Sequence, residues 1–396
     1  MKEGWKETNF GNFVDCNPKI SIKKGQVVEN CEMEDINPDY KFLYPREGKL
    51  YNGSNSKFQN GDTVFARITP CLENGKIAQI KDLKTEAAIG STEFFVFRGK
   101  SQVSDNEFIY YLSKSNLVRD TAVNSMTGAS GRQRADLKAL KKLKIKVPSS
   151  VKHQQRIASI LYAYDDLIEV NNKRIELLEQ SARELYKEWF VRMRFPNYQN
   201  TKFNKGIPEG WEEKSPFDIS EVLYGYPFNS SLFNENEGIP VVRIRDIIAN
   251  SKTTFTIENI DNRYLLNDGD ILIGMDGDFH IQRWMNGIAY INQRVVRLRA
   301  KTDCIYNSCF IENVIREPIF FLNSIIVGTT VAHLSDKDMK KIKLLIPTDD
   351  LIIKFKILTD PVTETIITLF KQNQQLTEIR NRLLPRLISG KLEIKE

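Results

Sequence analysis

The chain has 396 residues, of which 41% are hydrophobic and 27% are charged, with a formal net charge of +6. This composition is typical of a soluble globular protein, and five cysteines without a Cys-x-x-Cys pair favour a reduced protein over a disulfide framework. The amino terminus lacks the apolar stretch of a signal peptide and no apolar run is long enough to cross a bilayer, so we expect a cytoplasmic protein.

One segment occurs twice in the chain, in the same order and at a spacing of about 200 residues. Its landmarks are Gly-Trp at 4–5 and 210–211, Gly-Asp before an apolar run at 61–62 and 269–270, and Lys-Val-Pro at 146–148 against Leu-Ile-Pro at 345–347. Each copy is long enough to be a domain with its own core. We therefore predict an α+β protein with two similar domains, each followed by a long helix.

The first 150 residues alternate short β-rich runs with turn signals. The predicted strands include TVFARI at 63–68, GKIAQI at 75–80 and TEFFVFRG at 92–99. Residues 106–123 have apolar side chains three and four apart, which predicts one helix capped by Asp105 or Asn106. The polar, glycine-bearing loop TGASGRQR follows at 127–134 and is too polar to be core.

Two long stretches carry heptad seams. Between 151 and 191 the seam consists of Ile157, Leu161, Tyr164, Ile168, Ile175, Leu178, Ala182, Leu185 and Trp189, with Asn171 as its polar member. The second copy has Val362, Ile366, Leu369, Leu376, Leu383 and Leu387, with Asn373 polar. Forty helical residues extend about 60 Å, more than the diameter of a small domain, so the two helices should pair antiparallel with each other. The alternative is that each seam packs against its own domain. Pro385 should end or kink the second helix.

The candidates for chemistry are few. The three histidines, His153, His280 and His333, lie far apart without companions at metal-ligand spacing, and no phosphate-binding loop ends in Gly-Lys-Ser/Thr. Asp39, Glu47 and Lys49 imitate a magnesium-dependent nuclease site, but Pro45 and Gly48 should spoil the strand that it needs. The acidic residues Asp268, Asp270, Asp276 and Asp278 are best explained as turn residues. We predict no catalytic and no metal-binding residue.

The remaining candidates suit nucleic-acid binding, because arginine, glutamine and hydroxyl side chains pair with phosphates and base edges. In the first copy they are Arg67, Thr127, Ser130, Arg132, Gln133 and Arg134. In the second copy they are Arg243, Arg245, Arg283, Trp284, Thr329, Thr330 and His333. For any single arginine, an ordinary solvated position on the surface is as good an explanation as nucleic-acid binding. Together, in both copies, they favour a DNA-binding surface near strand ends and loops.

Several long segments, in the same order, resemble the specificity subunits of type I restriction-modification systems over essentially the whole chain. They are NPKISIKKG and CEMEDI near the start, MTGASGRQRADLKALKKLKIKVP at 126–148, RIELLEQSARELYKEWFVRMRFP at 174–196, GYPFNSSLFNENEGIPVVRIRDI at 225–247 and LLPRLISGKLEI at 383–394. The resemblance implies two target-recognition domains, at 1–150 and 196–348. It also implies two spacer helices, at 151–195 and 349–396, that form an antiparallel coiled coil.

The resemblance also implies a non-catalytic chain that binds double-stranded DNA, each domain reading half of a split site. Two methylation subunits using S-adenosylmethionine would modify adenine, and restriction subunits using ATP and magnesium would cut, so no cofactor is expected in this chain. Tyr186, Trp189 and Phe190 are candidates for docking the methylation subunits, or else cap the coiled coil. The alternatives are the scaffold of a methyltransferase-only complex, a magnesium-dependent nuclease or single-chain methyltransferase, and a protein that bridges other proteins without DNA.

Overall fold

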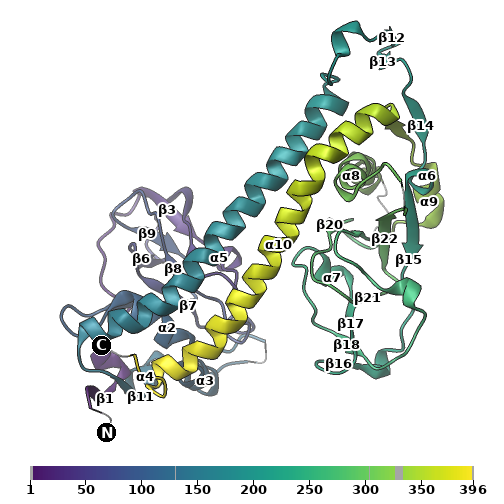
Figure 1. The fold of residues 1–396 in the computed structure, drawn as a ribbon. Helices are drawn as coiled ribbons and strands as arrows, with labels where there is room; N and C mark the ends of the chain where they lie inside the picture. The colour runs from purple at the N-terminus through teal and green to yellow at the C-terminus, as the bar shows by residue number, and fades with distance from the viewer. Residues whose placement is uncertain (1–2, 130, 303, 326–332, 395–396) are drawn as a thin grey trace. The chain divides into compact units, whose positions relative to one another are not determined.

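The structure, a computed structural model, describes residues 3–129, 131–302, 304–325 and 333–394 (Figure 1). Three of the predicted DNA-binding residues, Ser130, Thr329 and Thr330, lie outside the described residues. The chain forms two compact units, the first made of Met1–Val170 with Asn373–Glu396 and the second of Asn171–Gln372. Each unit therefore contains one copy of the repeat together with a part of each long helix.

The first unit is built on two sheets. Its larger sheet has the strand order β2 (Val14–Cys16), β10 (Phe94–Gly99), β7 (Thr63–Ala66), β8 (Ile77–Ile80) and β4 (Phe42–Leu43). The smaller sheet has the order β5 (Arg46–Leu50), β3 (Val27–Cys31), β9 (Ala88–Gly90) and β6 (Ser56–Phe58). All four residues of β7 and of β8 are buried, the polar Thr63 and Gln79 included, which agrees with the position of both strands inside the sheet. The three strands predicted from the sequence are present.

The helices of the first unit are α1 (Phe10–Phe13), α2 (Asn106–Lys114), α3 (Asn116–Asn124) and α4 (Leu137–Lys142). The prediction of one helix at 106–123 is wrong, because the chain is extended at Ser115, whose hydroxyl donates to the Leu112 carbonyl oxygen at 2.5 Å. The cap of α2 is Asp105, whose carboxylate accepts from the Phe108 backbone N–H. Strands β1 (Trp5–Asn9) and β11 (Lys144–Pro148) pair antiparallel and complete the unit.

The second unit repeats this plan. An antiparallel sheet has the order β15 (Ser220–Tyr224), β22 (Val295–Ala300), β19 (Ile271–Gly274) and β20 (Ile281–Arg283), and a smaller sheet has the order β16 (Phe233–Asn234), β18 (Phe255–Thr256), β17 (Ile239–Val242) and β21 (Tyr290–Ile291). Strand β14 (Glu212–Lys214) pairs with β23 (Leu344–Ile346) as β1 pairs with β11. The helices are α6 (Pro216–Ile219), α7 (Ile244–Ile247), α8 (Ser308–Ile325) and α9 (Asp336–Lys341).

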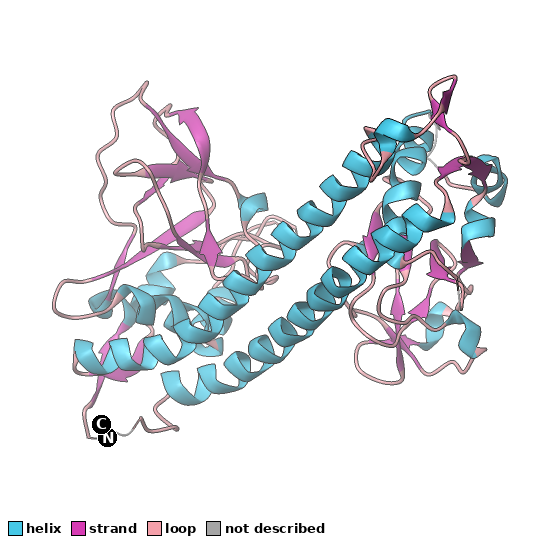
Figure 2. Cartoon of the chain, turned by 45° about the horizontal axis from the view of Figure 1, so that its top comes forward, coloured by secondary structure: helices cyan, strands magenta, loops and turns pink. Residues whose placement is uncertain are grey.

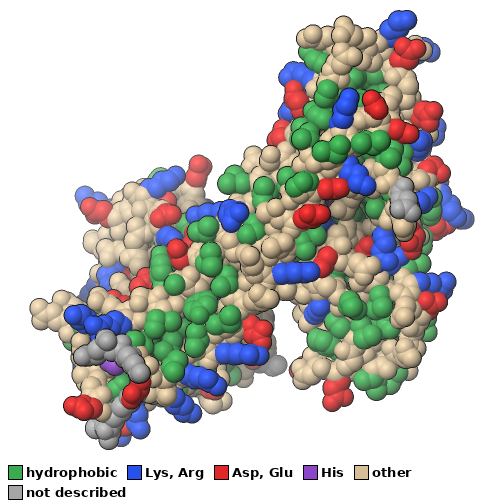
Figure 3. All heavy atoms as spheres, in the orientation of Figure 1, with side chains coloured by type: hydrophobic (Ala, Val, Ile, Leu, Met, Phe, Trp, Pro, Cys, Tyr) green, Lys and Arg blue, Asp and Glu red, His purple; other side chains and the backbone are tan. Residues whose placement is uncertain are grey.

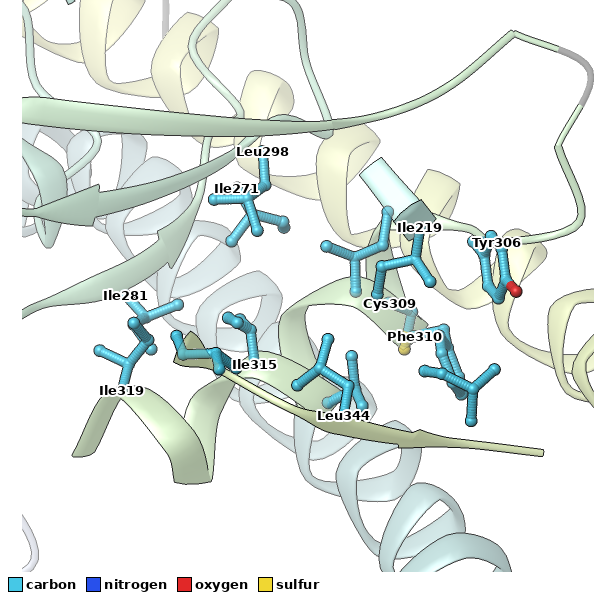
Figure 4. Packing of buried hydrophobic residues seen from close by; sticks show 14 of the residues in the cluster. Ile219, Ile271, Ile281, Leu298, Tyr306, Cys309, Phe310, Ile315, Ile319 and Leu344 are labelled. Carbon is cyan, nitrogen blue, oxygen red and sulfur yellow. The ribbon is translucent and has the colours of Figure 1, made fainter. Parts of the chain in front are cut away.

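The core of the second unit lies between its antiparallel sheet and α8. Figure 4 shows Ile271 and Leu298 from the sheet in one cluster with Ile315 and Ile319 from the helix. Each of these four side chains is at most 1% exposed. Burying one isoleucine or leucine in this way stabilises a fold by about 1.5–3 kcal/mol relative to leaving it in water.

A buried aspartate-arginine pair occurs at the same place in both copies. Asp62 binds Arg98 through both carboxylate oxygens at 2.6 Å, and Asp270 binds Arg299 in the same manner at 2.7 Å. Each aspartate also accepts a backbone N–H three residues earlier, at 2.7 Å. The interpretation of Asp270 as a turn residue is thus confirmed, and the pair ties the turn before β7 or β19 to the neighbouring strand.

The two long helices are α5 (Val151–Tyr186), which continues as a π-helical turn at Lys187–Val191, and α10 (Asp349–Ile388). In the first unit Asp165 contacts Arg380, while the Ile168 carbonyl accepts from Asn373. In the second unit the ring of Trp189 lies 6.1 Å from that of Phe355. Ala182 of α5 and Ile366 of α10 also line one cavity in the second unit. In both units, therefore, the numbering rises along one helix as it falls along the other, which confirms the predicted antiparallel pairing of the two helices drawn in Figure 2.

Two details of the helices differ from expectation. Helix α10 continues to Ile388, so Pro385 does not end it where it stands. The alternative that each seam packs against its own domain is also partly right, because Ile157 and Leu161 belong to the core of the first domain while Ala182 and Trp189 belong to that of the second. The seam therefore serves two purposes, pairing and domain support.

Asp62→Ala should destabilise the chain by about 3 kcal/mol, because it leaves the Arg98 guanidinium partly buried without its counter-charge. Denaturant-induced unfolding of the full chain measures the loss, and Asp270→Ala should cost a similar amount. The matched control is Glu378→Ala, whose ion pair with Arg382 is exposed on both sides and should matter little. A loss at Asp62 no larger than that of the control would contradict a supporting role for the pair.

Candidate nucleic-acid interface

The predicted DNA-binding loop at 127–134 is a small hairpin fixed to the end of β7. Thr127 and Arg134 exchange both backbone hydrogen bonds, at 3.0 and 2.9 Å. Gly128 and Gly131 both have positive φ, which other residues rarely adopt and which explains why glycine stands at these two positions. The backbone of Gln133 exchanges hydrogen bonds with Thr69, donating to its hydroxyl at 3.1 Å and accepting from its N–H at 3.0 Å. The loop is thus held at the end of a buried strand.

Glu93 connects this loop to the sheet. Its carboxylate accepts from Arg134 at 2.6 and 3.0 Å and from Arg67 at 3.0 Å. The hydrogen bond from Arg134, together with the one from Arg67, outweighs burial and holds the pKa of Glu93 below its usual value. Arg67 and Arg134 therefore lie together, as a site requires, while the exposed side chain of Arg132 has no partner among the described residues.

The second copy has a corresponding site with different charged residues. The bridge between Ile68 and Arg134 corresponds to one between Asp276 and His333. There, Oδ1 of Asp276 lies 2.6 Å from Nδ1 of the His333 ring, close enough to accept a hydrogen bond from a protonated Nδ1, and Oδ2 lies 3.4 Å from the Arg294 guanidinium. Backbone bonds of 2.8 Å fix the correspondence, because Ala135 donates to Arg67 as Leu334 donates to Met275.

The carboxylate has thus changed position between the two copies. Glu93 and Arg294 occupy corresponding places, since the backbone N–H of Arg67 donates to the first and that of Met275 to the second, both at 3.0 Å. In the first copy a carboxylate at this place binds two arginines, whereas in the second an arginine at this place binds a carboxylate. Sequence reasoning missed Glu93, Asp276 as a partner of His333, and Arg294. Aligning the repeat residue by residue around the strands could have found them.

Two predicted residues are not at any surface. Trp284 is fully buried, and its indole N–H donates to the Gly287 carbonyl oxygen. Arg283 is 5% exposed and binds Glu312 of α8 at 2.6 Å. The prediction that they bind DNA from a strand end or loop is therefore wrong, because Arg283, at the end of β20, and Trp284, which follows it, are both buried in the interior. Arg243 and Arg245 stand at α7, where Arg245 donates to the Thr254 hydroxyl at 3.0 Å.

The proposed docking aromatics are also less exposed than expected. Trp189 is 9% and Phe190 7% exposed, and Tyr186 is half-buried. The Phe190 ring lies 5.2 Å from that of Phe355 and 5.6 Å from that of Phe310. The expectation of an exposed aromatic surface is wrong, because these rings fill the core where α5 meets α8 and α10. Their packing agrees with the alternative, that they cap the helix pair.

The nuclease-like residues do not assemble a site. Strand β5 does form across Arg46–Leu50, so the expectation that Pro45 and Gly48 would prevent it is wrong. Lys49, however, binds Glu32 at 2.6 Å. Across the described residues, no three histidine, cysteine, aspartate or glutamate side chains are grouped so that they could hold a metal ion. In the same part of the chain, no helix is both long and apolar enough to span a membrane.

Basic side chains are distributed over both units on the face that Figure 3 shows, interspersed with acidic ones, rather than gathered in one patch. A dispersed arrangement of this kind gives little long-range attraction.

The chain matches the family model of the type I restriction modification DNA specificity domain twice, over residues 3–180 and 208–378. It is 30% identical to the MjaIX specificity subunit of Methanocaldococcus jannaschii, over 74% of this chain and 70% of that protein. It is 24% identical to the MjaVIII specificity subunit of the same organism, over 100% and 94% of the two chains. The crystal structure of a type I restriction-modification S subunit from M. genitalium, 17% identical, matches with a TM-score of 0.51 over 99% of this chain and 97% of that one.

Each of the two matched regions contains one sheet domain with its charged loop site, so both copies of the repeat match a DNA specificity domain. The chain belongs to the family of type I restriction-modification specificity subunits.

The anchoring of the 127–134 loop should depend on pH. Because the pKa of Glu93 is lower in the folded chain than in the unfolded one, its ion pairs stabilise the fold above the usual glutamate pKa of about 4.3, and the contribution is lost as the pH falls through the lower folded value. Wild type should therefore be more stable than Glu93→Gln between pH 7 and 5, and the difference should shrink at lower pH. Denaturant unfolding across a pH series measures it. A difference that persists unchanged at pH 3 would refute this account.

Proposed function

We propose that this chain is the subunit through which a type I restriction-modification complex reads a two-part DNA site, one half with each sheet domain. The observation that carries the proposal is the duplicated loop site, which keeps one backbone framework but exchanges its charges. Because the backbone of the two loop sites is alike, each domain could approach a DNA duplex in the same way. Because their side chains differ, the two domains could read different base sequences. The recognition domains would then be 1–150 and 196–348, and the spacer helices 151–195 and 349–396.

The residues proposed to contact DNA are those near the loop sites or on α7 that remain accessible. They are Arg67, Thr127, Arg132, Gln133, Arg134, Arg243, Arg245 and His333. Arg132 is the strongest of them, because its side chain is exposed and has no partner among the described residues, whereas Glu93 already holds Arg67 and Arg134. An unpaired guanidinium loses less on binding a phosphate or guanine edge than one that must first leave a carboxylate.

The proposed partners are double-stranded DNA, two methylation subunits that modify adenine, and restriction subunits that join through the complex. The support for two methylation subunits is the internal duplication, which offers each copy of a partner an equivalent place. S-adenosylmethionine, ATP and magnesium would act in those partners.

Arg132→Ala should weaken binding of the assembled complex to its target about tenfold or more, because one direct contact to DNA is lost. Binding is measured over a salt series, since loss of a phosphate contact also lowers the slope of affinity against salt. Arg382→Ala is the control, because it removes an exposed cation of α10 that does not belong to the loop. Unchanged affinity at every salt concentration would remove this loop from the interface.

The proposed function also predicts the form of the DNA sequence that the complex methylates. In a cell that expresses the complex, methylated adenines should fall within a motif of two specified halves separated by unspecified bases, and the two halves should differ in sequence. Single-molecule sequencing of the genome reads this directly. A continuous motif would refute reading by two domains, and identical halves would refute the importance of the exchanged charges.

A further inference from the structure

One buried carboxylate joins three elements of the first unit. Asp165 of α5 accepts the Tyr111 hydroxyl of α2 on Oδ2 at 2.6 Å, and its Oδ1 accepts the Arg380 guanidinium of α10. Their exposed fractions are 4% for Asp165, 1% for Tyr111 and 5% for Arg380. A domain helix and both long helices therefore meet at a single acceptor group.

The charges at this junction are fixed by their surroundings. Burial of Arg380 is the largest single effect and opposes its charged form, but the attraction and hydrogen bond of Asp165, together with Tyr110 and Tyr111, outweigh it and raise the pKa of the guanidinium. A buried ion pair of this kind contributes little net stability compared with apolar side chains of the same shape. Its geometry is nevertheless strict, because sliding α10 along α5 or turning α2 away would leave a buried charge or hydroxyl without its partner.

At the corresponding place in the second unit, no carboxylate of the described residues joins both long helices to a domain helix. The pattern of buried positions along α5 recurs along α10 at an offset of 198 residues. By this offset, Ile157 and Ile168 of α5 correspond to Phe355 and Ile366 of α10. By this correspondence Thr363 takes the place of Asp165, and Ala182 that of Arg380. Both are buried, neither is charged, and both line a small cavity. Among the described residues, the link through one carboxylate therefore belongs to the first half of the repeat, while Glu179, Arg283 and Glu312 line the cavity in the second half.

We propose that Asp165 is a positioning residue for DNA recognition: it fixes the orientation of the first domain on the helix pair, and thereby the spacing at which the two half-sites are read. The proposal rests on the proposed function, the reading of a two-part site. Tyr111 transmits the position of the helix pair to the domain, and Arg380 fixes which turn of α10 lies beside α5. Each base pair added to the spacer both shifts and rotates one half-site relative to the other. To distinguish spacers that differ in length by one base pair, the domain must therefore be held in a fixed orientation on the helix pair.

The test replaces the charged pair with neutral residues of similar shape, Asp165→Asn together with Arg380→Met, in the full chain assembled with its methylation partners. Such a replacement should keep thermal stability near that of wild type. Genome-wide mapping of methylated adenine should then show both half-site sequences unchanged, with sites whose spacer is one base pair longer or shorter methylated about tenfold more often than by wild type. A merely structural role would lower total methylation without changing the preferred spacer.

Two further variants keep the result decisive. Tyr111→Phe removes only the link to the domain and should widen spacer tolerance in the same direction, and it decides the question alone if the double variant does not assemble. Thr363→Val, at the corresponding place in the second unit, is the matched control and should leave the spacer unchanged. A wild-type spacer in the folded double variant, or in Tyr111→Phe, overturns the role of Asp165. Wild-type methylation at an undivided motif would instead overturn the proposed function.

Discussion

The antiparallel pairing of α5 and α10 is the contact on which both domains depend. Each helix carries a seam of buried and half-buried side chains, and an isolated helix of this kind would leave the seam in water. Within each unit the paired segments also supply part of the domain core, through Ile157 and Leu161 in one case and Ala182 and Trp189 in the other. A domain therefore cannot shift on its helix segments without exposing apolar surface, so each domain is held to the segments of α5 and α10 in its own unit.

The two duplicated domains share one kind of buried ion pair and differ in the charges of their loop sites. The pairs Asp62–Arg98 and Asp270–Arg299 are the same in kind and geometry, because they shape the turn that leads into the central strand. The loop sites beyond those strands share backbone bonds but exchange the positions of acid and base. Gene duplication followed by divergence at exposed ends of a common framework would produce this pattern. Recognition can change there without altering the core, since loop side chains contribute little to packing.

Sequence periodicity predicted the elements that are long or repeated, and failed where a local choice depended on neighbours distant in sequence. The break at Ser115 interrupts a good helical pattern, and the pattern does not show that the serine hydroxyl caps the preceding turn. Arg283 and Trp284 have the composition of a binding surface, yet both are interior because Glu312 and Gly287 provide partners there. Tyr186, Trp189 and Phe190 were expected at an exposed helix end, but the rings of Phe310 and Phe355 enclose them.

The amino-acid sequence by itself determined the duplication, the α+β class, the two long helices and the loop at 127–134, because these follow from local spacing of apolar, glycine and basic residues. Tertiary structure alone decided which charges meet. Glu93 joins Arg67 to Arg134, Asp276 joins His333 to Arg294, and Asp165 joins Tyr111 to Arg380. Each of these groups combines residues far apart in the chain, and the strength of a charged contact depends on distance and burial, which only the folded chain sets.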